Sequence, residues 1–207
     1  MIIVSAEKQK KHLTRLVFAD GGEILLDSSV CENHALRADT EITEEKLNEL
    51  KYESEYERAK ERALWYLDRA DRTEKALFQK LVTAGFDKRA CAEVLSRLKE
   101  LGLVDDTRFA ENFAGRCRES CVSPRQAVSK MLAKGVPYEI AKAAADNSDT
   151  DEEEQLRRLI EKKYARKLGE ENGAQKVYAA LARKGFSFSA VRSVLKKYSE
   201  ELEYCEE

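Results

Sequence analysis

An internal repeat is the feature that most constrains this chain. Glycines recur at an interval of 50 residues, and an apolar residue follows each one: Gly85-Phe86, Gly135-Val136 and Gly185-Phe186. Four positions before each glycine the chain again has an apolar residue: Leu81, Met131 and Leu181. Units that bury their apolar faces only against neighbours produce such periodicity. We therefore expect tandem repeats that spread the core along an axis and give an elongated body.

Composition favours helices for these repeats. The 207 residues include only two Pro and nine Gly, while 37% are charged and 43% hydrophobic. The formal net charge is −2, from 37 basic and 39 acidic residues, whereas an autonomous DNA-binding protein is usually more basic. Five irregularly spaced cysteines do not form a disulfide framework, and no segment is typical of a signal peptide or a membrane span. We expect a soluble, cytoplasmic protein.

The segment from Leu101 to Ala114 is interpreted as the joint between two repeats. Gly102 is placed to end one helix in a left-handed cap, and Asp105 and Asp106 offer oxygens to the free N–H groups of the next. Phe109 and Phe113 then lie one helical turn apart on an apolar face. Paired aspartates can also indicate a divalent metal, but capping already explains them. No metal site is predicted here.

The first 50 residues differ from the rest. Apolar runs separated by Asp20-Gly21-Gly22 predict two or three strands with a hairpin at these glycines. A short helix is expected from Ser28 to Leu36, and Thr43 is a candidate cap for another helix through Leu47 and Leu50. The predicted module covers residues 1–50, and the charged segment 51–60 leads into the first repeat.

Three three-helix repeats are predicted for the remainder, covering residues 51–104, 105–148 and 149–207, the last with an acidic tail. In the first, Asp71 or Thr73 is expected to cap the second helix. In the second, Ser123 precedes Pro124 at the first helical position. The third is expected to begin after the acidic run 149–154, with Asn172 and Gln175 resembling a capping box.

Several motifs together resemble the RecX family of bacterial recombination regulators. They are Ala63-Leu64 with Arg72-Thr73, Gly102-Leu103-Val104-Asp105-Asp106 leading to Phe109-Ala110, Lys134-Gly135-Val136, and Arg183-Lys184-Gly185-Phe186. The resemblance covers about residues 57–198, and the glycine-to-Phe-Ala element is its most specific part. It implies a crescent of three helical repeats that lodges in the groove of the RecA nucleoprotein filament. Such a protein would modulate recombinase and coprotease activity, usually by inhibition.

Basic residues are the candidate contacts with the filament or its DNA. Two interpretations stay open: a solvated surface balanced by nearby glutamates, or a surface that faces DNA or an acidic groove wall. Arg158, Lys162 and Arg166 are expected to share one helix face at four-residue steps. The full set is Arg116, Arg118, Arg125, Lys130, Lys134, Arg157, Arg158, Lys162, Lys163, Arg166, Lys167, Arg183, Lys184, Arg192 and Lys196.

Other chemistry is sparse in the sequence. Cys117 and Cys121 lie one turn apart without a second ligand pair, so they are interpreted as inert thiols rather than a zinc site. Trp65 and Tyr66 could stack on bases, but on a helix with Leu64 and Leu67 we interpret them as core residues. The sequence has no Gly-rich phosphate-binding loop, no nucleophile motif and no pair of carboxylates in a catalytic arrangement. We therefore predict neither an enzyme nor a cofactor.

Two other functions compete with filament regulation. A transcription factor could present a helix from each glycine-centred pair to a major groove, but the segments 88–101 and 138–145 carry mixed charge and mostly small residues. A helical adaptor would differ from the regulator only in its partner. We expect a monomer that binds the RecA filament, with weak DNA binding of its own.

Overall fold

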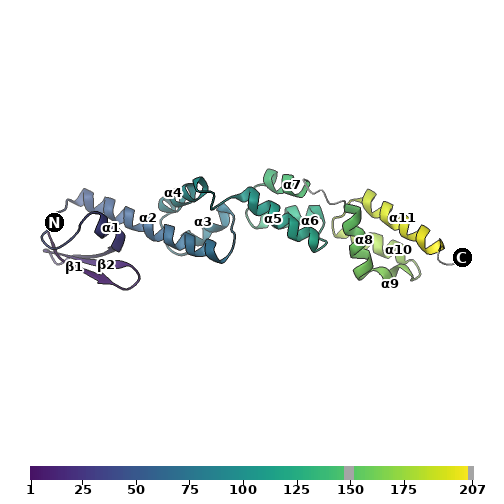
Figure 1. The fold of residues 1–207 in the computed structure, drawn as a ribbon, viewed down its shortest axis with the longest axis horizontal. Helices are drawn as coiled ribbons and strands as arrows, with labels where there is room; N and C mark the ends of the chain where they lie inside the picture. The colour runs from purple at the N-terminus through teal and green to yellow at the C-terminus, as the bar shows by residue number, and fades with distance from the viewer. Residues whose placement is uncertain (147–151, 205–207) are drawn as a thin grey trace. The chain divides into compact units, whose positions relative to one another are not determined.

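The structure, a computed structural model, describes residues 1–146 and 152–204, with side chains up to residue 198. Within these residues the chain forms eleven helices and three strands. This confirms the predicted mainly helical fold with a small β-containing N-terminal module (Figure 1). The chain divides into two compact units, Met1–Val104 and Asp105–Glu207. They are called unit 1 and unit 2 below.

Unit 1 begins with a three-stranded antiparallel sheet in the order β1-β2-β3. The strands span Ile3–Gln9, Leu13–Phe18 and Glu23–Asp27. Alternate residues of β2, namely Thr14, Leu16 and Phe18, are buried, as expected for a sheet with one covered face. The hairpin predicted at Asp20-Gly21-Gly22 is confirmed, and Gly21 has the positive φ of +85° that its turn requires.

Two helices cover this sheet. Helix α1, Ser28–Asn33, ends earlier than the predicted Leu36 because Ala35 adopts a left-handed conformation, with φ of 49°. Helix α2, Glu44–Arg69, is capped by Thr43, whose side chain accepts a hydrogen bond from the Lys46 N–H at 3.2 Å. The two helical segments expected on either side of residue 50 are one continuous helix of 26 residues.

Repeat one combines the second half of α2 with α3, Glu74–Thr83, and α4, Lys88–Glu100. Ala59 and Ala63 of α2 are fully buried, so the helices of this repeat pack against small side chains. Of the two predicted caps, Thr73 is the one used: its hydroxyl accepts from the Ala76 N–H at 3.2 Å. The core of the sheet and the core of repeat one are separate clusters joined by α2 (Figure 1).

Repeat two opens unit 2 with α5, Asp106–Glu119, α6, Pro124–Ala133, and α7, Tyr138–Asp146. The predicted cap at Asp105 is confirmed, since its carboxylate accepts from the N–H groups of Thr107 at 2.8 Å and Arg108 at 3.0 Å. Ser123 caps α6 with Pro124 at the first helical position, also as predicted.

Repeat three contains α8, Glu152–Lys163, α9, Ala165–Leu168, α10, Gly173–Arg183, and α11, Phe188–Tyr204. The start of the acidic run, residues 149–151, lies outside the described residues. The predicted capping box at Asn172 is wrong: this residue is left-handed, with φ of 60°, and makes no capping hydrogen bond with its side chain. A residue that caps a helix with its side chain typically has an extended backbone, which Asn172 does not have.

The glycine register has a structural cause. Gly85, Gly135 and Gly185 have φ of +96°, +92° and +83°, which glycine adopts without steric cost. In each repeat the following residue donates its N–H to the carbonyl five positions earlier: Phe86 to Leu81, Val136 to Met131 and Phe186 to Leu181. This is the Schellman pattern, in which the same two residues also make an apolar contact. The pattern explains why both the glycine and its apolar partners recur.

Candidate functional site

The predicted contact residues of repeat two lie at the ends of its first two helices. Arg116 and Arg118 are in the last turn of α5, and Arg125 is in the first turn of α6. Lys130 is in the last turn of α6, and Lys134 is its C-cap residue. Arg118 is half-buried and the other four are exposed. Repeat two therefore presents cations from neighbouring helix ends.

Two of these cations meet at an aromatic ring. The guanidinium carbon of Arg116 lies 5.8 Å from the centre of the Phe113 ring, and the Lys134 Nζ lies 5.5 Å from it. Phe113 is half-buried and stacks on the buried Phe109, with ring centres 6.1 Å apart. Both cations are within the distance at which a ring face attracts positive charge. The ring thus helps to hold Arg116 and Lys134 together.

Three cations of repeat two affect a buried thiol. Burial raises the pKa of the Cys117 thiol, while Lys130, Arg116 and Arg118 act in the opposite direction. Arg116 and Arg118 flank Cys117 in the last turn of α5, so positive charge gathers at this end of the helix. The outcome favours the neutral thiol, which is unreactive at neutral pH.

The basic face predicted for repeat three is interrupted. Arg158 and Lys162 do lie on one helix, α8, but that helix ends at Lys163. Arg166 belongs to the short helix α9, beyond a break at Tyr164. The predicted continuous face of three residues on one helix is therefore wrong. The break lies at Tyr164, which is half-buried and packs against the core of repeat three.

The basic residues of α8 and α9 are all exposed. Arg157, Lys162 and Lys163 lie on α8 with Arg158, and Lys167 lies on α9 beside Arg166. Arg158 forms an ion pair with Glu154 one turn earlier on the same helix. Exposed pairs of this kind contribute little to stability. Arg158 is consequently partly neutralised, which favours the solvated interpretation at this one position.

The last predicted contacts lie on α10 and α11. Arg183 is exposed at the end of α10, where its Nε donates to the Ala179 carbonyl at 3.2 Å. Lys184 is half-buried, and its carbonyl accepts a hydrogen bond from the Ser123 hydroxyl at 2.6 Å. Arg192 and Lys196 are exposed one helical turn apart on α11. The structure thus leaves three of these four side chains at the surface.

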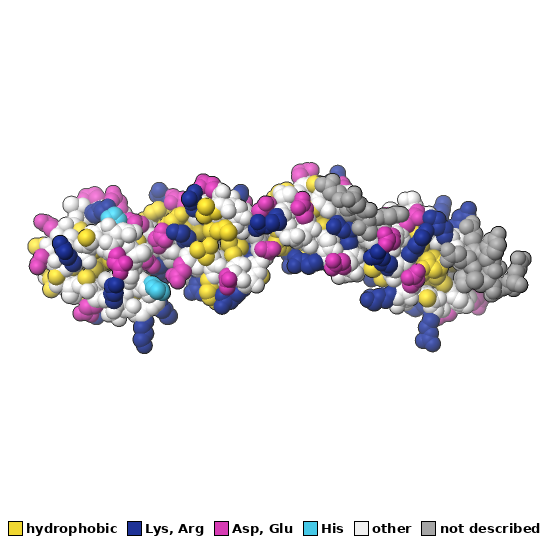
Figure 2. All heavy atoms as spheres, viewed as in Figure 1, with side chains coloured by type: hydrophobic (Ala, Val, Ile, Leu, Met, Phe, Trp, Pro, Cys, Tyr) yellow, Lys and Arg dark blue, Asp and Glu magenta, His cyan; other side chains and the backbone are white. Residues whose placement is uncertain are grey.

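Repeat one has an exposed aromatic side chain, Trp65, that the sequence does not predict. Trp65 was interpreted as a core residue, but it is 44% exposed, and the neighbouring Leu64 is 41% exposed. The core positions of this helix are instead the small residues Ala59 and Ala63. Figure 2 shows hydrophobic side chains gathered at the surface of the repeat-one part of unit 1, with Lys and Arg side chains around them.

Cations accompany the exposed Trp65 and the half-buried Tyr66 of α2, and Tyr66 packs against the core of repeat one as predicted. The guanidinium carbons of Arg69 and Arg62 lie 3.4 Å and 5.4 Å from the centre of the Trp65 ring. Arg72 and Lys80 lie 5.7 Å and 5.2 Å from the ring of Tyr66. The helical spacing of Arg62, Trp65 and Arg69 was the available signal, because residues three and four apart share a face.

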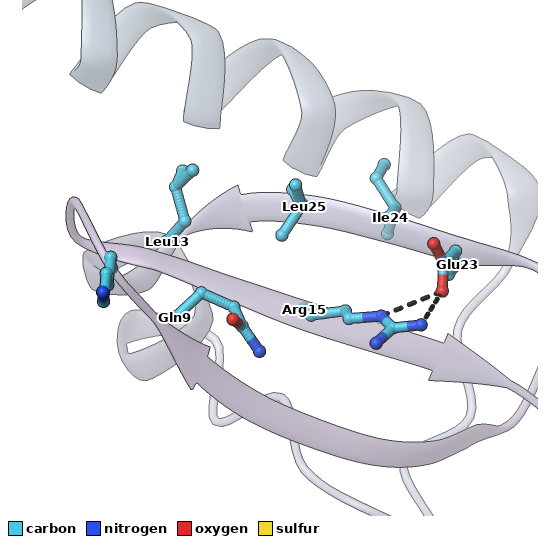
Figure 3. A pocket seen from close by; sticks show the side chains of 7 residues that line it. Gln9, Leu13, Arg15, Glu23, Ile24 and Leu25 are labelled. Atoms are coloured by element: carbon cyan, nitrogen blue, oxygen red, sulfur yellow. Dashed lines mark hydrogen bonds and ion pairs between the residues drawn. The ribbon is translucent and has the colours of Figure 1, made fainter.

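A further hollow lies on the sheet of unit 1. It has a volume of about 690 Å³ and is lined by residues of all three strands and by Lys10. Figure 3 shows Arg15 reaching across to Glu23, to which its Nε donates at 2.9 Å. Because Glu23 pairs with Arg15, Lys10 is the one other cation in this lining, and the hollow offers little to an anionic ligand.

Among residues 1–146 and 152–204, no group of three or more His, Cys, Asp or Glu side chains is arranged to hold a metal ion. Cys117 is buried, while Cys121 is half-buried in a left-handed conformation with φ of 51°. No helix within the described part of the chain has the length and apolar character needed to cross a bilayer.

Two segments of the chain match models of known protein domains. Residues 59–98 match the first three-helix domain of RecX, and residues 151–195 match the third three-helix domain of RecX. These segments correspond to α2–α4 of repeat one and to α8–α11 of repeat three. The match agrees with the repeats seen in the fold.

Relatives cover most of the chain. The regulatory protein RecX of Amycolatopsis mediterranei is 32% identical over 161 residues, which are 74% of this chain and 92% of the relative. The regulatory protein RecX of Clostridium tetani is 26% identical over 199 residues, covering 94% of this chain and 92% of the relative.

Solved structures show the same fold. A crystal structure of regulatory protein RecX aligns with a TM-score of 0.73 at 23% identity, covering 93% of this chain and 98% of that chain. The crystal structure of RecX from Lactobacillus salivarius aligns with a TM-score of 0.65 at 24% identity, covering 69% of this chain and 96% of that one.

Proposed function

The chain belongs to the RecX family of regulatory proteins, and from this premise we propose that it binds in the groove of the RecA nucleoprotein filament and inhibits recombinase, ATPase and coprotease activity. It would act by binding rather than by catalysis, as a monomer in the cytoplasm. No cofactor is needed for such a role. The RecA part of this proposal comes from the family resemblance, and the surface of unit 2 supports it.

The observation that carries the proposal is the cluster of cations at the helix ends of repeat two. Arg116 and Lys134 share the Phe113 ring, and Arg116 and Arg118 flank Cys117 in the last turn of α5. A compact group of cations suits a groove that contains DNA phosphates, because each neutralised phosphate releases a counterion. We propose that the cations of repeat three, led by Lys162, Arg166 and Arg192, extend this contact.

The helix-turn-helix alternative finds less support. A recognition helix in a major groove needs side chains that reach base edges along one face. The third helix of repeat two, α7, offers only Lys142 among its nine residues, beside Glu139 and Asp146. The cations of this repeat lie instead on α5 and α6. This distribution favours contact with phosphates or with protein over base readout.

Titration of the protein into preformed RecA filaments tests the proposal. We expect slower ATP hydrolysis and slower cleavage of a coprotease substrate at substoichiometric amounts. Replacing Arg116 and Lys134 by Ser should weaken this inhibition and flatten its salt dependence. The matched control replaces Lys75 and Lys88, two exposed lysines of unit 1, by Ser. Unchanged ATPase, filament length and coprotease activity with the wild-type protein would favour an adaptor for another partner.

We also propose the repeat boundaries 51–104, 105–148 and 149–207, with 1–50 as the N-terminal module. What supports them is that each repeat has its own cluster of buried residues. Helix α2 crosses residue 50, so the first boundary is a division of cores and not a break in the backbone. Limited proteolysis would test these boundaries by locating the first cleavage sites.

A further inference from the structure

We propose that unit 1 carries a binding site for a nucleotide of single-stranded nucleic acid, in the hollow between the β1–β2 turn and α2. The base would lie against Trp65, and the phosphate among the surrounding cations. This site is separate from the contacts proposed for unit 2 and does not require RecA. With this site the protein would bind single-stranded nucleic acid directly.

The hollow has the size and lining of a small-ligand site. Its volume is about 360 Å³, at the lower end of the range of roughly 300–1,000 Å³ found for small-molecule pockets. Its basic members come from two elements: Lys11 from the turn, and Arg58 and Arg62 from α2. Glu61 is its one acidic residue. The remaining lining residues are His12, Leu13, Trp65 and Phe86. Positive charge thus outweighs negative charge around an aromatic surface.

Trp65 is held in place at this site without being part of the core. Arg69 lies over the ring at 3.4 Å, and its Nη1 also donates to the Trp65 carbonyl at 3.1 Å. Tyr66 meets the indole edge-on, with ring centres 5.2 Å apart. A fixed and 44% exposed indole beside cations is a stacking platform of the kind that single-strand-binding proteins use.

The turn that forms the opposite wall has an unusual backbone. Lys11 and His12 have positive φ values of 64° and 55°, a region that costs most residues about 1–2 kcal/mol each. The His12 carbonyl accepts a hydrogen bond from the Ser28 N–H at 2.8 Å, which helps to fix the turn. Residues kept in such conformations often belong to functional sites. Here the turn places a lysine and a histidine beside α2.

The charges distinguish this hollow from its neighbour. A second hollow shares Lys11, His12 and Glu61 with it. It adds three carboxylates, Asp27, Glu32 and Glu57, and one lysine, Lys8, which pairs with Glu32. Phosphate would be repelled there and attracted to the side with Arg58 and Arg62. A nucleotide fits the first hollow, because its base can lie on the indole face while its phosphate meets the cations. The proposed ligand is therefore a nucleotide within a single strand.

Trp65 also provides the measurement, because it is the only tryptophan in the chain. Adding a 15-nucleotide oligo(dT) to the full-length protein without RecA should quench its fluorescence with saturation. An abasic oligonucleotide of the same length keeps the phosphates and should quench far less. Equal quenching by the abasic strand or by poly-glutamate would mean that the site binds polyanions in general, which would overturn the proposal.

Variants locate the site through the anisotropy of a fluorescein-labelled oligo(dT). Trp65→Ala should weaken binding by roughly 5- to 150-fold, the range expected for loss of one stacked base. Phe188→Ala, which removes an aromatic ring that is 67% exposed in unit 2, should leave the affinity unchanged. Arg62→Ser should weaken binding more than Lys75→Ser, a matched loss of charge in the same unit.

Circular dichroism and melting temperature identify variants that fail to fold, and the conservative Trp65→Phe should retain most of the affinity. If folded Trp65→Ala binds as tightly as the wild type, the site does not exist. If it loses oligonucleotide binding but still inhibits RecA, the nucleotide site stands apart from the proposed regulatory surface. Loss of RecA inhibition in the unit 2 variants alone would leave this inference intact.

Discussion

Repeats one and two begin their second helices differently from repeat three. Thr73 and Ser123, which are 50 residues apart, are buried and cap α3 and α6 with their hydroxyl groups. The corresponding position in repeat three is Gly173, which has no side chain to cap α10. An added Cβ at Gly173 would collide with the Lys167 carbonyl oxygen and lie 3.0 Å from that of Leu168. Close packing of the α9 turn therefore replaces a capping side chain.

The repeats also differ in how they satisfy the backbone N–H group just before the third helix. The residues just before α4 and α11 are Asp87 and Ser187, and their N–H groups donate to the side chains of Glu55 at 2.8 Å and Glu152 at 2.9 Å. Repeat two has Pro137 at this position, which has no N–H to satisfy. The repeats thus preserve their geometry while changing the chemistry that satisfies the backbone. The following predictions test how far this equivalence extends.

The largest effect is expected in the cores. Phe109 and Leu159 occupy corresponding positions, 50 residues apart, and both are buried, with exposures of 8% and 4%. Phe109→Ala should lower the free energy of unfolding by about 3–5 kcal/mol and Leu159→Ala by about 2–5 kcal/mol, because each leaves a cavity. Urea denaturation measures both. The half-buried Phe113 provides the control, and Phe113→Ala should cost less than half as much as Phe109→Ala.

A loss below 1 kcal/mol at Phe109 would contradict its role in the core of repeat two. The structure places Phe109 in that core together with Ala110, Met131 and Val136. A loss at Phe109 with none at Leu159 would mean that the corresponding positions of repeats two and three are not equivalent.

The next effect tests the close turn of repeat three. Gly173→Ala should lower the free energy of unfolding by about 1–3 kcal/mol, because the new methyl group has no space beside the Lys167 carbonyl. Gly115→Ala is the matched control, since its nearest neighbour would be the Arg118 Nη2 at 3.7 Å. Within helix α5 that change should raise stability by about 0.5–1 kcal/mol. Similar losses for both variants would contradict this account of the turn.

The third-largest loss of stability is expected at Ser123, the N-terminal cap of α6. Ser123→Ala should cost about 1–2 kcal/mol, because the hydroxyl both accepts from the Gln126 N–H and donates to the Lys184 carbonyl. Gln175→Ala, at the position of the capping box that the sequence suggested, should change stability by less than about 0.5 kcal/mol. A clear loss in Gln175→Ala would restore that capping box. Thermal or urea unfolding distinguishes the two outcomes.

These comparisons also show what the sequence can predict. The caps at Thr43, Thr73, Asp105 and Ser123 depend on side chains within three residues of the bonds they make, so local patterns suffice. The glycine register is equally local, because each Schellman turn closes within six residues. Most of the secondary structure could therefore be predicted from the sequence.

The features that the sequence did not reveal depend on tertiary packing. Trp65 is exposed because Ala59 and Ala63 supply the buried face of α2, a choice that apolar composition alone does not decide. The break at Tyr164 carries no Gly or Pro signal, and the break separates Arg166 from the basic residues of α8. The candidate site was therefore predicted as a set of cations, while their grouping around Phe113 and Cys117 required the structure.

The smallest expected effect concerns charge within repeat three. The Ser193 hydroxyl, and then the Lys197 ammonium at 2.9 Å, hold the pKa of the Glu153 carboxyl below its ordinary value. Since this pKa is lower in the folded state than in the unfolded state, the carboxylate adds stability at neutral pH. That contribution begins to fall as the pH nears the ordinary carboxyl pKa of about 4.3, and it is lost as the pH drops through the folded value.

An NMR titration of the Glu153 side-chain carboxyl tests this electrostatic contact between α8 and α11. Ser193→Ala and Lys197→Met should each raise the pKa of Glu153, because the hydroxyl and the ammonium both hold this pKa low. Glu153→Gln should make the unfolding midpoint of unit 2 less sensitive to pH below the ordinary carboxyl pKa of about 4.3. A Glu153 pKa unchanged in both variants would mean that neither Ser193 nor Lys197 helps to hold α8 and α11 together, and that other contacts, among them the buried Ile160 and Val194, do so.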